Sequence, residues 1–211
     1  EVDGPRFVTH PFDQSRGRSN SISSSRVQAP HSFVAASKMR RTQTRALAAR
    51  PYAEKMRWVL ADLAETLPFV DVETLPPLLR RHDDVKTVEV VYITPDRGLC
   101  GGLPAILNRR MASFILELGK PVRIVAVGRK GRGFMRRTGQ DVVAEFINIG
   151  DNPGYEELRP IAQVVMEDFV NGLADEVFIH YGQFVSTVVQ RPEIYKLLPV
   201  EPPVEAATWG V

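Results

Sequence analysis

The residues best suited to bind a ligand form a glycine-rich turn between a predicted strand and a predicted helix. The strand is Val88–Ile93, a mostly β-branched run, and the turn Pro-Asp-Arg-Gly-Leu-Cys-Gly-Gly follows it. Free N–H groups at a helix start favour an anion, so one interpretation is a phosphate cradle. The other is a tight connection in which Gly98, Gly101 and Gly102 supply backbone freedom, at least one of them with a positive φ. We favour the tight connection, because the turn fits neither G-x-G-x-x-G nor G-x-x-x-x-G-K-[ST].

A second candidate is a basic stretch after the next predicted strand. Val122–Gly128 is typical of a strand that ends in glycine, and the basic segment Arg129–Arg137 follows it. This segment could be a phosphate loop, but it lacks the Lys-Ser/Thr ending that positions magnesium. We therefore predict the start of a surface helix there. The neighbouring pair Asp96-Arg97 is interpreted as a local ion pair that shapes its own turn.

The sequence contains no residue set with the spacing of a catalytic or metal site. The four histidines lie far apart, and no Ser/His/Asp arrangement is present. The single cysteine, Cys100, cannot form an internal disulfide. We therefore predict no catalytic residue, no metal ligand, no cofactor-binding residue and no cofactor.

Hydrophobic periodicity predicts alternating strands and helices in the second half of the chain. The predicted strands are residues 88–93, 122–128, 142–149 and 176–181, and 184–189 continues or pairs with the last. Helices are predicted from Pro104 to Leu118 and over residues 158–169. This order favours an α/β fold with a mostly parallel, Rossmann-like sheet and flanking helices, because parallel strands need crossover connections.

A long helix is predicted ahead of the sheet. Residues 33–67 are rich in helix-favouring Ala, Arg, Met, Leu and Glu. Small and apolar residues recur as the a and d positions of a heptad, which is typical of a coiled coil. These positions are 39, 46, 53, 60 and 67, with 42, 49, 56 and 63. Pro51 argues against a continuous helix, since a proline inside a helix lowers its stability by about 3 kcal/mol. The alternative to a coiled coil is an ordinary amphipathic helix that lies on its own domain.

The same helix is strongly basic near its start, where Lys38, Arg40 and Arg41 cluster. Such a run is usually a solvated face. It could also meet an acidic partner surface, and the sequence by itself favours the solvated face.

The remaining segments complete a four-part organisation around the stalk helix. Residues 1–32 are predicted to be disordered, because they are rich in Ser and Arg without sustained periodicity. Residues 68–200 form the predicted α/β domain, which opens with a proline-rich connection of about one helical turn, and residues 201–211 form a proline-rich tail. The net charge of +2 is too small to indicate nucleic-acid binding. No apolar run approaches the roughly 20 residues of a membrane span, so we expect membrane association only through partners.

Several motifs resemble the gamma subunit of rotary ATP synthases. Thr94–Leu103 is similar to the segment T-S-D-R-G-L-C-G-G-L of that family, with Pro95 in place of Ser. Three further matches are Val-Ala-Ala-Ser-Lys-Met-Arg-Arg at 34–41, Ala-Arg-Pro-Tyr-Ala-Glu-Lys-Met at 49–56 and Val-Gly-Arg-Lys-Gly at 127–131. The stretch 181–199 follows the pattern Y-x-x-F-x-S-x-x-x-Q-x-P-x-x-x-x-L-L-P. Pro51 belongs to the family pattern, so the resemblance supports the coiled coil over residues 33–67.

The resemblance implies a central-stalk subunit of a proton-translocating F-type ATP synthase. Such a subunit couples rotation driven by proton flow to ATP synthesis on the alpha and beta subunits, and is itself not catalytic. The implied partners are the alpha, beta and epsilon subunits and the membrane ring of c subunits, with no nucleic acid. The implied location is peripheral, on the cytoplasmic face of a bacterial cell membrane or the equivalent inner membrane of an organelle. On this interpretation Lys38, Arg40 and Arg41 contact acidic loops of the beta subunit.

The resemblance stops near both ends of the sequence. Residues 1–32 depart from the family, which begins with a basic helix, and the tail 201–211 ends where the family continues with a strand and a long helix. We therefore expect a fragment whose seam lacks its partner helix and which cannot act as a rotor by itself. The alternative from another class is a nucleotide- or phosphate-binding α/β enzyme that uses the Gly98–Gly102 turn and the segment Arg129–Gly133.

Overall fold

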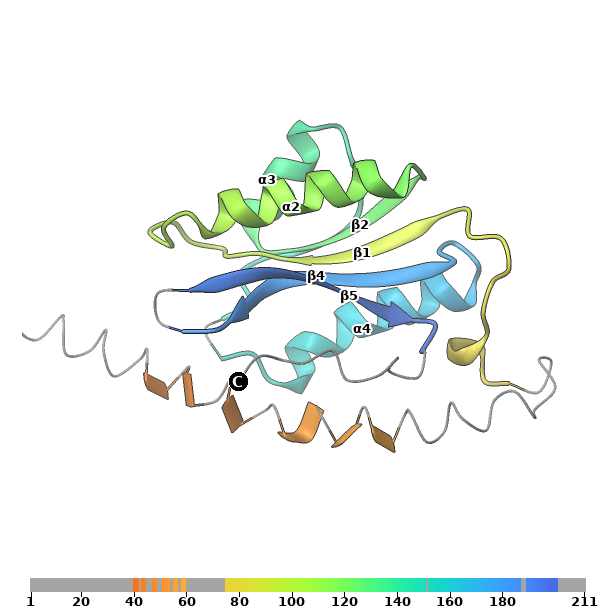
Figure 1. Ribbon diagram of the computed structural model, residues 1–211, viewed down its shortest axis with the longest axis horizontal. Coiled ribbons are helices and arrows are strands. Elements are labelled where there is room, and N and C mark those ends of the chain that lie inside the picture. The colour runs from red at the N-terminus through yellow and green to blue at the C-terminus, as the bar shows by residue number, and fades with distance from the viewer. Residues whose placement is uncertain are drawn as a thin grey trace, which may run out of the picture. The chain divides into compact units, whose positions relative to one another are not determined.

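A five-stranded sheet forms the centre of the fold in the computed structural model (Figure 1). Its strands are β1 (Val88–Ile93), β2 (Val122–Val127), β3 (Asp141–Phe146), β4 (Glu176–Phe184) and β5 (Gln190–Leu198). The strand order is β3-β2-β1-β4-β5. Neighbouring strands pair in parallel, except β4 and β5, which are antiparallel. The predicted mostly parallel α/β sheet is confirmed.

Helices cover both faces of the sheet. They are α2 (Leu103–Leu118), α3 (Arg129–Arg137) and α4 (Tyr155–Val170), with a short 3₁₀ helix η3 (Pro77–Leu79) before β1. Figure 1 shows α2 and α3 on one face and α4 on the other. Each face of the sheet has its own hydrophobic core, and alternate side chains of β1 contribute to the two. Val90 and Tyr92 pack in the core with α2 and α3, and Val91 packs in the core with α4. A strand covered on both faces is built mostly from apolar residues, which explains the β-branched run.

Two predicted strand assignments are wrong in detail. The strand predicted over 142–149 ends at Phe146, because Asn148 has a φ of 62°, which an extended strand does not allow. Beyond Phe184 the chain turns: the N–H groups of Val185 and Ser186 donate to the Val189 carbonyl at 3.2 and 3.0 Å. The strand that pairs with β4 is β5, for which no strand was predicted.

The structure describes residues 75–150, 152–186 and 189–200, and positions 40, 41, 43, 44, 47, 48, 51–53, 55, 56, 58 and 59. The described positions between 40 and 59 are helical on both sides of Pro51, as predicted. The rest of the predicted stalk helix 33–67, the leader 1–32 and the tail 201–211 lie outside the described residues, so the coiled coil stays a prediction. The chain divides into two units, Glu1–Ala48 and Ala49–Val211, which are described separately. Among the described residues no helix combines the length and apolar character needed to cross a bilayer.

Candidate functional site

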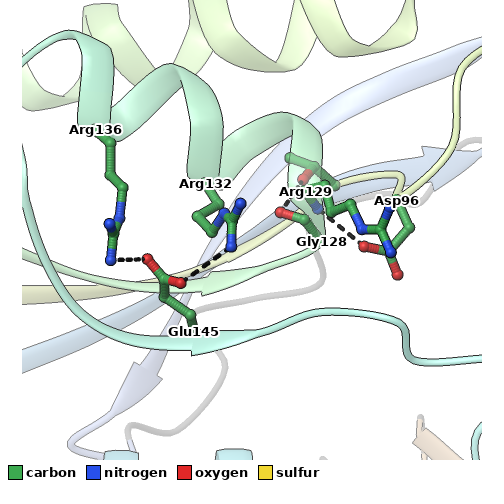
Figure 2. A network of polar contacts seen from close by, with 7 residues as sticks. Asp96, Gly128, Arg129, Arg132, Arg136 and Glu145 are labelled. Atoms are coloured by element: carbon green, nitrogen blue, oxygen red, sulfur yellow. Dashed lines mark hydrogen bonds and ion pairs between the residues drawn. The ribbon is translucent and has the colours of Figure 1, made fainter.

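The start of α3 is bonded to the loop that leaves β1. The Arg129 N–H donates to Asp96 Oδ1 at 3.0 Å, a contact drawn in Figure 2. The Lys130 N–H donates to the Pro95 carbonyl at 3.2 Å, and the Gly131 N–H to Thr94 Oγ1 at 2.8 Å. A phosphate at this helix start would need these same N–H groups. The chain's own carboxylate, carbonyl and hydroxyl occupy them instead.

The two glycines that flank this helix start allow the close approach. A Cβ at Gly128 would lie 1.9 Å from the Thr94 carbonyl oxygen, and the residue has a φ of +95°. A Cβ at Gly131 would lie 2.6 Å from Thr94 Cγ2 and 2.7 Å from Tyr92 Cε1. Real side chains are not tolerated at such distances. The absence of a side chain at both positions therefore lets the β1 loop pack closely against α3.

An open cleft of about 530 Å³ lies at the carboxyl ends of β1, β2 and β3. Its polar side chains come from Asp96, Arg97, Arg129 and Asn148, and its apolar walls include Ile149. The Arg129 guanidinium donates to Asn148 Oδ1. The lining residues include no cysteine, serine, histidine or lysine, and the Thr94 hydroxyl faces the Val127 and Gly128 carbonyls at 3.2 and 3.3 Å. The cleft thus presents charged and amide side chains beside apolar walls.

The predicted glycine turn lies at the surface before α2. Gly101 has a φ of +59°, so the predicted positive φ is confirmed, and Leu99 also has a positive φ of 62°. A Cβ at Gly98, Gly101 or Gly102 would meet nothing within 4 Å. Glycine at position 101 thus suits the backbone conformation of the turn and is not needed there to make space.

The basic segment 129–137 is the predicted surface helix, and part of its charge is compensated. Figure 2 shows Arg132 and Arg136 directed from α3 toward Glu145 on β3. The Asp96 carboxylate caps α3, a partner that the interpretation as a local pair with Arg97 did not include. Asp96 and Arg129 are 33 positions apart, and only the T-P-D order after a strand, typical of turn and cap residues, hints at this role.

The predicted partner-contact residues are only partly described. Arg40 and Arg41 are helical and exposed, and Lys38 lies outside the described residues. In the described part of the chain no group of three or more His, Cys, Asp or Glu side chains could hold a metal ion.

Comparisons with known proteins agree with one another. The profile of the family described as ATP synthase matches residues 16–209. The ATP synthase gamma chain of Dehalococcoides mccartyi is 54% identical over 170 residues, which are 81% of this chain and 59% of that protein. The gamma chain of Chloroflexus aurantiacus is 44% identical over 182 residues, 85% of this chain and 62% of the relative. The chain therefore spans less than two thirds of the length of these curated relatives.

A solved structure shares the fold. It is the Tetrahymena thermophila mitochondrial ATP synthase, central stalk and c-ring, whose matching chain has a TM-score of 0.63 and 24% identity. The match covers 79% of this chain and 70% of that chain.

Proposed function

The chain belongs to the ATP synthase gamma-chain family, and we propose that it forms the central-stalk portion of a proton-translocating rotary ATP synthase. The identity of 54% over 170 residues to a curated gamma chain carries this proposal. The shared fold with a central-stalk structure supports it.

In this role the chain couples two distant processes without performing chemistry. An asymmetric shaft makes different contacts with each catalytic subunit, so its rotation changes the nucleotide affinity of each site in turn. The proposed partners are the alpha, beta and epsilon subunits and the c-ring. ATP chemistry belongs to the alpha and beta subunits.

The proposed location is peripheral, on the membrane face that carries the catalytic subunits. That face is the cytoplasmic side of a bacterial cell membrane, or its equivalent in an organelle. The proposal rests on the membrane-associated complex to which the family belongs.

The basic start of the stalk helix is the proposed contact with acidic loops of the beta subunit. Replacing Lys38, Arg40 and Arg41 with Gln in an otherwise complete complex should weaken the coupling of ATP hydrolysis to proton pumping. The melting temperature should change by less than about 2 °C, because exposed charges contribute little to folding stability. Pumping by membrane vesicles and thermal unfolding of the chain measure the two effects.

The matched control removes an equal number of exposed positive charges from the α/β unit, at Arg109, Lys120 and Lys130. This control should retain coupling. Equal loss of coupling in both variants, or a large loss of stability in the first, would argue against the proposed contact.

The alternative, a nucleotide- or phosphate-binding enzyme, has one observation in its favour. The cleft lies at the carboxyl ends of parallel strands, where ligands of open α/β sheets often bind. The bonded N–H groups at the start of α3 weigh against it.

A further inference from the structure

A buried cluster of charged side chains lies at the amino ends of β1 and β2, opposite the cleft. Glu89 on β1 is fully buried, and its register partner on β2 is Arg123. Arg123 Nε lies 3.5 Å from Glu89 Oε2, and Arg123 Nη2 donates to Asp168 Oδ2 at 2.6 Å. Asp168 belongs to the last turn of α4. The cluster thus joins β1 and β2 to α4, the helix that covers the sheet face opposite α2 and α3.

The cluster has two carboxyl groups but one guanidinium. The short bond shows that Arg123 pairs with Asp168, whereas its 3.5 Å contact with Glu89 is long for a hydrogen bond. Glu89 Oε1 is buried without a hydrogen-bond partner. An ionised Glu89 would therefore be a buried charge with an unsatisfied oxygen beside a second carboxylate. Both conditions favour the neutral form.

We propose that Glu89 carries a proton in the folded α/β domain and so fastens the last turn of α4 to β1, a contact that ionisation loosens. The protonated carboxyl supplies an O–H donor for Asp168, whose charge remains paired with Arg123. Burial, followed by hydrogen bonding to Asp168 and its negative charge, raises the pKa of Glu89 to about 8, although Arg123 acts in the opposite direction. This inference concerns the domain itself and does not depend on the proposed function.

Among the described residues, the register partners on the strands other than β2 place no charge beside Glu89. Its register partner on β4 is the apolar Val177. The register partner of Arg123 on β3 is Asp141, which is exposed. The charged groups that act on Glu89 are Arg123 from β2 and Asp168 from α4. The nearby titratable group is His82, whose ring packs on Phe169, the residue after Asp168, and whose Nδ1 lies 3.4 Å from Asp175 Oδ1.

The bound proton makes the stability of the folded domain depend on pH, and the direction of that dependence can be worked out. Above pH 4.5, the ordinary pKa of a glutamate, the unfolded chain releases this proton while the folded domain keeps it. The folded state then binds more protons, so stability falls as pH rises. The contribution is fully present below about pH 4.5. As the pH rises further, the folding equilibrium constant falls by up to about tenfold per pH unit, and the contribution is lost near pH 8.

Urea unfolding of the 211-residue chain between about pH 5 and pH 10 tests this, with Glu89→Gln as the neutral analogue. The ratio of the wild-type folding constant to that of Glu89→Gln should fall by up to about tenfold per unit and level off above about pH 8. Glu117→Gln, at an exposed glutamate of α2, should keep the wild-type profile. A wild-type to Glu89→Gln ratio that stays constant across this range would overturn the proposal.

A direct titration remains decisive if Glu89→Gln folds poorly. The Glu89 carboxyl carbon, followed by NMR in the folded wild-type chain, should titrate near pH 8. In Asp168→Asn the midpoint should move down, because a like charge is removed. A wild-type midpoint below about pH 6 would show that Glu89 is ionised in the folded domain at neutral pH, and a midpoint unmoved by Asp168→Asn would show that Glu89 does not contact Asp168; either result would overturn the proposal.

Discussion

Gly131 and Gly133 lie two residues apart in α3, yet an added methyl group would meet different surroundings at each. At Gly131 the Cβ would clash with Thr94 and Tyr92, whereas at Gly133 it would meet only the end of the flexible Arg137 side chain at 3.2 Å. Gly131→Ala should therefore lower the free energy of unfolding by about 1–3 kcal/mol through overpacking. Gly133→Ala should raise it by about 0.4–1 kcal/mol, because alanine restricts the unfolded chain.

Urea titrations of the two variants against the wild type measure this difference. The pair shares helix, residue type and substitution, so general effects of the change cancel. Equal shifts in both variants would show that the close approach of the β1 loop to α3 does not control stability.

Single residues also mark the limit of what the sequence could predict at the site. A positive φ in at least one of Gly98, Gly101 and Gly102 was predictable from the glycine-rich turn, and Gly101 has it. The bond between Asp96 and the Arg129 N–H was not, because it depends on how the ends of β1 and β2 meet. The contacts of Glu89 with Arg123 and Asp168 could not be predicted either, because the sequence of an apolar strand does not show which distant side chains pack against its one glutamate.

At the scale of elements, the starts of α2 and α3 are poor phosphate sites. At α2, Pro104 has no N–H, the Leu103 N–H donates to the Cys100 carbonyl at 3.4 Å and the Ile106 N–H to the Gly102 carbonyl at 3.0 Å. At α3 the β1 loop takes the N–H groups. Calorimetric titration of the chain with ATP, NAD or phosphate should therefore detect no saturable binding.

The same titration on Asp96→Ala serves as the control, because that variant frees the Arg129 N–H while leaving the cleft residues otherwise unchanged. Tight binding of any of the three ligands to the wild type would favour the enzyme alternative.

The sequence predicted the buried elements well and the edge of the sheet poorly. β1 and β2 are mostly apolar because helices cover both faces, with Glu89 and Arg123 as the charged exceptions, and that burial is visible as β-branched runs. β5 is an edge strand containing Pro192 and several charged residues, which prevent unwanted pairing but also conceal its strand pattern. Its pairing with β4 is a tertiary contact that local pattern does not encode.

At the scale of the whole molecule, the proposed role is that of a part of a rotor. In the α/β unit, Gly128 and Gly131 allow close packing of the β1 loop against α3 at one end of the parallel sheet, and a buried charged cluster lies at the other end. Such a domain can transmit force between partners, because close packing resists deformation.

The most direct test replaces the matching 170-residue stretch of the Dehalococcoides mccartyi gamma chain with that of this chain. The hybrid is assembled with the other subunits of that ATP synthase in membrane vesicles, and ATP-driven proton pumping is measured beside ATP hydrolysis. We predict that the hybrid complex assembles and pumps protons in proportion to the ATP it hydrolyses. A complex that hydrolyses ATP without pumping, or subunits that assemble without the hybrid chain, would contradict it.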